Sequence, residues 1–217
     1  MTETEWQSCT EPACMVTFLQ GKVSERKIRL FLVACARSNW VRFEPADMRQ
    51  AVEAAEKFAD GLVSEECLRE HNAAMYGYAT RGDREAREWM FGAMEKQCIH
   101  RLALATTFNS LGLAKLTQTV SYWHSLYLTE ASQPALIRDV FGPLPFRSIL
   151  FRPDWRTANV LALSHDIYEE RAFPRLPILG EALIRAGCEN EDIIDHLRSE
   201  GPHVRGCWVL DLVLNKE

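Results

Sequence analysis

Apolar residues recur every three or four positions over most of this chain, which is the spacing of one face of an α-helix. The pattern is cleanest between residues 48 and 62. The residues on this predicted face are Met48, Ala51, Val52, Ala55, Phe58, Ala59 and Leu62. Alternating apolar and polar runs, which would indicate strands, are nearly absent. The pattern therefore predicts an all-α, multi-helix globular bundle.

Residues that favour helix ends support this prediction. Thr2 and Glu5 have the spacing of a capping box, and Ser24 and Asn190 each precede an apolar run as an N-cap would. Gly187 follows an apolar run and suits the left-handed position just past a helix end. These signals predict helix boundaries near both ends of the chain.

A proline-containing stretch interrupts the helical pattern after residue 142. Pro143, Pro145 and Pro153 fix their own φ and favour extended backbone before them. We expect residues 1–142 to form an N-terminal helical bundle, 143–153 an extended linker, and 154–217 a compact C-terminal helical subdomain. One continuous domain is the alternative.

Composition narrows the class of protein. The chain has 217 residues, 47% hydrophobic and 25% charged, which is ordinary for a soluble globular protein. Its net charge of −5 argues against a general nucleic-acid binder. Seven cysteines without tight spacing indicate reduced thiols, and the acidic start lacks the regions of a signal peptide. We therefore expect a cytoplasmic protein.

One long stretch with few charges needs a separate test for a membrane span. Lys115 is the only charged residue between Leu102 and Leu128, but polar residues interrupt the stretch repeatedly. A bilayer requires a continuous apolar span of about 20 residues. We therefore expect an interior segment of the bundle and no membrane partner.

The most distinctive string, Gly-Pro-His-Val-Arg-Gly-Cys-Trp at 201–208, lies near the C-terminus. Pro202 suits the first turn of a terminal helix, on which His203 and Cys207 would share a face. The zinc-ligand residue types in this region are Cys188, His196, His203 and Cys207. Cys188 and His196 would lie at opposite ends of the preceding helix, about 9–12 Å apart. No CxxC or HxxxH pair supports the site, so zinc is an alternative hypothesis.

The favoured interpretation of the same residues is structural. Cys207 and Trp208 would be core residues, and the histidines would satisfy backbone groups at helix ends. Arg205 lies beside Trp208 and could pair with Asp211 or with a carboxylate of another protein. Arg205 and Trp208 are therefore candidate partner contacts. A thiolate–imidazolium pair of Cys207 with His203 is a further alternative, which burial of the thiol would oppose.

Searches for established catalytic motifs find none. There is no phosphate-binding Gly-Lys-Ser/Thr loop, no GxGxxG and no GxSxG, so no catalytic or cofactor-binding residue is predicted. The leading hypothesis is a non-enzymatic module that binds an unidentified protein partner. The alternative is a metal or reactive-thiol site at His203 and Cys207.

Both ends of the chain resemble a family of uncharacterised bacterial proteins, chiefly planctomycete. HVRGCWVLDLVLNKE, with LPILGEALIRAGC upstream, is similar to the family's usual ending, close to GPHVRGCWVVDLLLGKE. Residues 2–40 resemble its opening, although Cys35-Ala36-Arg37-Ser38 stands where the family often has Cys-Cys-Arg-Arg, and Asn215 replaces a common glycine. The resemblance is weaker over residues 65–135. No activity is assigned to the family, so the resemblance implies no catalytic residues.

Overall fold

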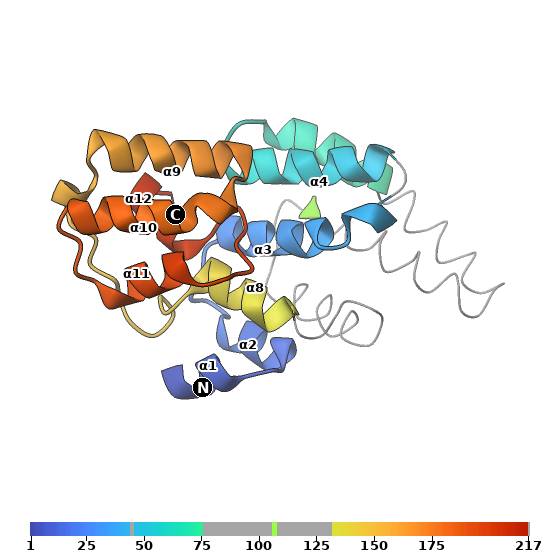
Figure 1. Cartoon of the computed structure of the whole chain (residues 1–217). Coiled ribbons are helices and arrows are strands. Elements are labelled where there is room, and N and C mark those ends of the chain that lie inside the picture. The colour runs from blue at the N-terminus through green and yellow to red at the C-terminus, as the bar shows by residue number, and fades with distance from the viewer. Residues whose placement is uncertain (44–45, 76–105, 108–131, 217) are drawn as a thin grey trace. The chain divides into compact units, whose positions relative to one another are not determined.

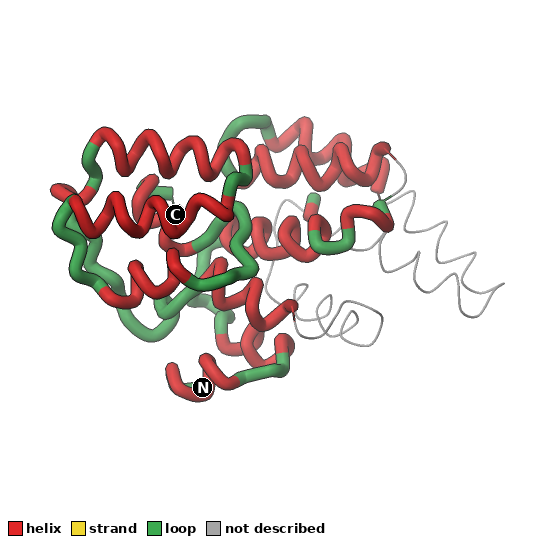
Figure 2. The backbone as a smooth tube through the Cα atoms, in the orientation of Figure 1, coloured by secondary structure: helices red, strands yellow, loops and turns green. Residues whose placement is uncertain are grey.

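The computed structural model describes residues 1–43, 46–75, 106–107 and 132–216, and these contain helices and loops but no strand (Figure 2). The all-α prediction is confirmed. None of the helices in these ranges is long and apolar enough to cross a membrane. The predicted interior segment from Leu102 to Leu128 lies outside the described residues, except for 106–107. The chain divides into two compact units, Met1–Pro134 and Ala135–Glu217, called here the N-terminal and C-terminal units.

The N-terminal unit begins with short helices and continues with longer ones. Its described elements are α1 (Glu3–Ser8), α2 (Pro12–Phe18), α3 (Glu25–Arg37), the 3-10 turn η1 (Trp40–Arg42), α4 (Ala46–Ala59) and helical residues 65–75. The predicted capping box is present: the Glu5 amide donates to Thr2 Oγ1, and the Thr2 amide donates to the Glu5 carboxylate. Ser24 caps α3 as predicted.

Helices α3 and α4 pack against each other and carry buried charges. Arg37 at the end of α3 donates a 2.7 Å hydrogen bond to Glu56 of α4. Arg26 makes a 3.0 Å ion pair with Asp60, just past the end of α4. A buried charge is costly unless it is paired, so these two contacts satisfy charges that packing of the helices removes from water.

The C-terminal unit holds the remaining described helices (Figure 1). They are α8 (Ser132–Phe141), η2 (Pro153–Trp155), α9 (Ala158–Glu170), η3 (Phe173–Arg175), α10 (Leu176–Arg185), α11 (Glu191–Arg198) and α12 (Trp208–Leu214). Two local predictions are confirmed here. Asn190 Oδ1 accepts a 3.2 Å hydrogen bond from the Ile193 amide and so caps α11, and Gly187 adopts φ of 85° after α10.

The core of the C-terminal unit forms where α9, α10, α11 and α12 meet. Helix α10 packs against α9 and α11, while α12 packs against α9. The largest side chains of this core include Trp155, Tyr168, Leu176, Leu179, Leu183, Ile193, Leu197 and Trp208. Arg156 donates to the carbonyls of Leu212 and Val213 in the last turn of α12, where carbonyls lack the i+4 amide partners of a helix interior. The last helix is therefore fastened at its C-terminal end as well as along its buried face.

The segment between α8 and η2 contains no helix, in line with its prolines, but it is anchored. Arg147 donates two 2.7 Å hydrogen bonds to the Asp192 carboxylate at the start of α11. These bonds lower the pKa of Asp192 below its ordinary value, although partial burial opposes the shift. The boundary between the units falls before Ala135, whereas the sequence placed the break after residue 142. Most of α8 and the whole of this segment thus belong to the C-terminal unit.

The terminal helix begins later than the sequence predicted. It starts at Trp208, not at Pro202, and Cys207 is its N-cap residue. Gly201 and Gly206 have φ of 94° and 93°, values that a right-handed helix excludes and that glycine adopts without steric cost. The prediction that His203 and Cys207 share one face of a helix is therefore wrong.

Gly142 provides a test of the packing around Trp208. It has φ of 54°, and a Cβ built there would lie 2.5 Å from Trp208 Cγ. We expect Gly142→Ala to lower the free energy of unfolding by about 2–4 kcal/mol, since left-handed strain and overpacking add. Gly187→Ala, at φ of 85° with no atom within 4 Å of the built Cβ, should cost only about 1 kcal/mol. Chemical denaturation measures both; equal losses would contradict the close contact with Trp208.

Candidate metal centre

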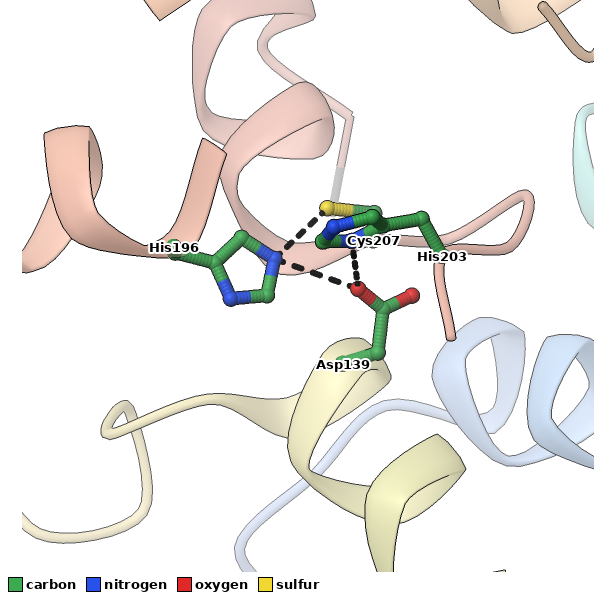
Figure 3. A group of neighbouring side chains, drawn as sticks. All are labelled: Asp139, His196, His203 and Cys207. Carbon is green, nitrogen blue, oxygen red and sulfur yellow. Dashed lines mark hydrogen bonds and ion pairs between the residues drawn. The ribbon is translucent and has the colours of Figure 1, made fainter. Parts of the chain in front are cut away.

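Four side chains with metal-binding atoms meet inside the C-terminal unit. Asp139 comes from α8, His196 from the last turn of α11, and His203 and Cys207 from the connecting segment 199–207. Figure 3 shows the four side chains pointing toward one another. One nitrogen, oxygen or sulfur atom from each lies within 4.8 Å of the corresponding atoms of the other three. We call these residues the Asp-His-His-Cys cluster.

The shortest distances in the cluster involve two atoms, Asp139 Oδ1 and His196 Nε2. Asp139 Oδ1 lies 2.8 Å from His203 Nδ1 and 3.1 Å from His196 Nε2. The same His196 Nε2 lies 3.1 Å from Cys207 Sγ. The two imidazole rings meet edge to face with their centroids 5.0 Å apart. The four donor atoms therefore form one close group.

The backbone of the connecting segment positions two members of the cluster. Helix α11 ends at Arg198, and the chain then turns back through Gly201 to reach Asp139. The Val204 amide donates a 2.9 Å hydrogen bond to Asp139 Oδ2, the carboxylate oxygen that does not contact the histidines. This bond holds the segment against α8 and leaves Oδ1 directed at the rings.

The Asp139 carboxylate is buried yet ionised. Burial by itself raises the pKa of a carboxyl group, because it penalises the charged form. Hydrogen bonds and charge interactions with His196 and His203 outweigh burial and bring the pKa of Asp139 below its ordinary value. The cluster therefore holds a negative charge that cationic groups must balance.

His203 is held by both of its ring nitrogens. Burial lowers its pKa, but the hydrogen bond and charge of Asp139, together with the Ser199 backbone, raise it overall. The Nε2 atom lies 3.1 Å from the Ser199 carbonyl oxygen, so an Nε2–H can donate to it. Nδ1 lies 2.8 Å from the ionised Asp139 carboxylate, which is also an acceptor, so Nδ1 carries the hydrogen of that bond, and only loss of this proton would direct an Nδ1 lone pair toward the cluster. Metal-ligating histidines commonly have one ring nitrogen on a backbone carbonyl in this way.

The arrangement differs from a cysteine–histidine–aspartate catalytic triad. In such a triad the carboxylate and the nucleophile contact opposite nitrogens of the histidine. Here Asp139 and Cys207 both contact Nε2 of His196. Cys207 is also completely buried. The imidazole found at hydrogen-bond distance from Cys207 is that of His196, and the arrangement does not have the order of a catalytic triad.

The structure brings together three of the four residues predicted as zinc ligands. His196, His203 and Cys207 join the cluster, whereas Cys188 and His196 were expected to lie too far apart to share an ion. Cys188 is not part of it; this residue is buried in the core of the unit, where burial raises the pKa of its thiol.

Asp139 is the member of the cluster that the sequence pattern did not indicate. It lies 64 positions from His203, and no local spacing joins the two. The one available signal was an acidic residue between Ile137 and Val140, in an apolar stretch of a short predicted helix.

The two predicted partner contacts lie inside the C-terminal unit. Arg205 is 7% exposed, donates to the Tyr168 carbonyl and the Glu169 carboxylate, and stacks over the Tyr168 ring. Trp208 is 2% exposed, with its ring centroid 5.1 Å from that of His196. Trp208 thus forms a wall of the cluster, and neither residue offers an open surface to another protein.

Fold and site together define an all-α protein whose C-terminal unit contains an Asp-His-His-Cys cluster with a buried aspartate, a buried cysteine and two half-buried histidines. Comparison of the sequence with protein-family models, with curated proteins and with solved structures gave no match. The resemblance of both chain ends to a bacterial family stays a prediction.

Thiol reactivity distinguishes a buried cluster cysteine from an activated nucleophile. In the native protein with EDTA present, we expect iodoacetamide to label exposed Cys14 and to spare Cys207 until the protein is unfolded, because Cys207 is fully buried. Cys35 is the matched buried control, and desolvation raises its pKa to about 12. Mass spectrometry of the labelled peptides measures the rates. Labelling of Cys207 ahead of Cys14 would instead support the reactive-thiol hypothesis.

Proposed function

We propose that the C-terminal unit is a helical module built around one structural divalent transition-metal ion, with zinc as the best-fitting ion. Asp139, His196, His203 and Cys207 are the proposed ligands. The observation that carries the proposal is the convergence of four donor atoms of the right types, from three separate segments, in one buried site.

The donor set and its dimensions support zinc. Zinc binds cysteine sulfur, histidine nitrogen and carboxylate oxygen at about 2.0–2.3 Å, so tetrahedral ligands lie about 3.3–3.8 Å from one another. The contacts in the cluster begin at 2.8–3.1 Å and all fall within 4.8 Å. Small side-chain shifts therefore suffice to admit an ion. Calcium and magnesium prefer sites made of oxygen alone, so sulfur and imidazole nitrogen disfavour them.

Hydrogen bonds around the ligands also support a metal site. The Ser199 carbonyl holds His203 through Nε2, and the Val204 amide holds Asp139 through Oδ2. Each bond uses the ligand atom that points away from the centre of the cluster. Such surrounding bonds orient ligands and strengthen metal binding.

Four protein ligands complete a tetrahedral site and leave no position for water or substrate. Closed sites of this kind contribute free energy of folding, whereas catalytic zinc sites keep one position open. The proposed role of the ion is therefore structural. A non-enzymatic module that acts by binding another protein suits such a centre, and the identity of the partner stays a prediction.

We also infer a reducing compartment, the cytoplasm, for this protein. None of the described cysteines Cys9, Cys14, Cys35, Cys67, Cys188 and Cys207 is in a disulfide. Free thiols persist where the cellular redox poise is reducing, and a thiolate ligand at Cys207 requires the reduced form.

Cobalt titration tests the proposed centre. Co²⁺ should bind the metal-free protein at one ion per chain and produce a thiolate-to-metal charge-transfer band in the near ultraviolet. Cys207→Ser should abolish this band. His196→Ala, His203→Ala and Asp139→Asn should each weaken affinity by at least about 10–100-fold, the cost already seen for losing an outer hydrogen-bond partner. Absorption spectroscopy measures the binding, and circular dichroism checks that each variant is folded.

Two matched controls lie in the same unit. Cys188→Ser removes a buried cysteine outside the cluster, and His165→Ala removes an exposed histidine on α9. Both should retain the wild-type cobalt spectrum. The proposal fails if wild-type protein binds no cobalt, or if Cys188→Ser rather than Cys207→Ser removes the charge-transfer band.

A further inference from the structure

Helix α8 is linked to the C-terminal helices through Asp139, while its apolar residues lie outside their common core. The buried core of the C-terminal unit runs from Ile149 to Val213 and includes no residue of α8. Asp139 nevertheless contacts both histidines and the Val204 amide. A polar cluster therefore links α8 to the segment that follows α11, in addition to the close contact of Gly142 with Trp208 just after α8.

The remaining three ligands have a different structural support. His196 ends α11, Cys207 caps α12, and His203 lies between them. Both helices contribute to the core, through residues such as Leu197 and Val209. These three ligands are thus held near one another by apolar packing that does not involve α8. Asp139 is the remote ligand, 64 positions before His203.

We propose that the metal ion acts as a clasp that fastens α8 to the C-terminal helices, so that metal occupancy controls the docking of α8. This inference rests on the proposed metal centre. An ion bound by all four side chains requires α8 to be docked, whereas an undocked α8 leaves the ion only three protein ligands. Because the ion binds the docked form more tightly, it must shift the equilibrium toward docking.

The charge of Asp139 strengthens this coupling. In the absence of metal, the buried carboxylate relies on hydrogen bonds from two imidazole rings and one amide. A divalent cation supplies a direct opposite charge at a site with little access to water, where charge interactions are stronger than at the surface. By reciprocity, whatever favours docking of α8 also raises the affinity for the ion.

Hydrogen–deuterium exchange of the full-length chain tests the clasp. Zinc at 100 times its Kd would favour the docked form by about a hundredfold if that form alone bound zinc. Because the undocked form keeps three ligands, exchange of α8 amides should slow by a smaller factor, about tenfold, relative to the protein with EDTA. Peptides from α10, which supplies no ligand, serve as the internal reference. In Asp139→Asn at saturating zinc, the ion should still protect 196–207 but no longer protect α8.

The matched control variant is Asp192→Asn. It also removes a carboxylate from the C-terminal unit and releases Arg147 in the segment after α8, but Asp192 is not a ligand. Zinc should protect α8 in this variant as in the wild type. Comparison of wild-type protein with and without zinc needs no variant, so the test stands even if Asp139→Asn does not fold.

The possible failures are distinguishable. If cobalt and zinc do not bind, the proposal of a metal centre is wrong, and the proposed clasp is wrong as well. If the metal binds with the expected spectrum but α8 exchanges at the same rate with and without zinc, the clasp is overturned and the structural centre stands. Loss of zinc-dependent protection of α8 in Asp192→Asn would also overturn it, because Asp139 would then not be the link.

Discussion

A buried carboxylate must be neutralised, and this requirement shapes the C-terminal unit. Asp139 is only 3% exposed and its pKa is lowered, so it carries a buried negative charge, which is costly unless opposite charges and hydrogen bonds surround it. Two imidazole rings and the Val204 amide supply them. To deliver these groups, α11 must end close to Asp139 and the chain must then turn back without helix. The late start of the terminal helix follows from the same path.

The polar cluster and the apolar core share a boundary at Trp208. This residue follows the cluster cysteine in the sequence, lies beside His196 and approaches Gly142 so closely that only a glycine fits without displacement. Packing of the tryptophan therefore fixes the position of the first turn of α12, and with it the direction of the Cys207 side chain. Apolar packing in the core thus helps to keep the four side chains of the cluster together, in addition to the hydrogen bonds among them.

The same four residues support different chemistry depending on which atoms meet. A cysteine nucleophile needs the imidazole between thiol and carboxylate, with one on each nitrogen, whereas a metal site needs all lone pairs to converge. The shared contact at Nε2 of His196 favours the second arrangement.

Local sequence predicted the helices, because their signals act between near neighbours. The caps at Thr2, Ser24 and Asn190 each bond an amide three residues away, so their pattern is visible without a fold. The cluster could be predicted only in part: the ligand types His196, His203 and Cys207 were recognisable, but not their meeting. Only tertiary packing added Asp139 to the cluster and placed Cys188 in the apolar core instead. It also determined that α12 begins at Trp208 rather than at Pro202. Donor atoms converge only when separate segments pack, and spacing along the chain does not encode such distances.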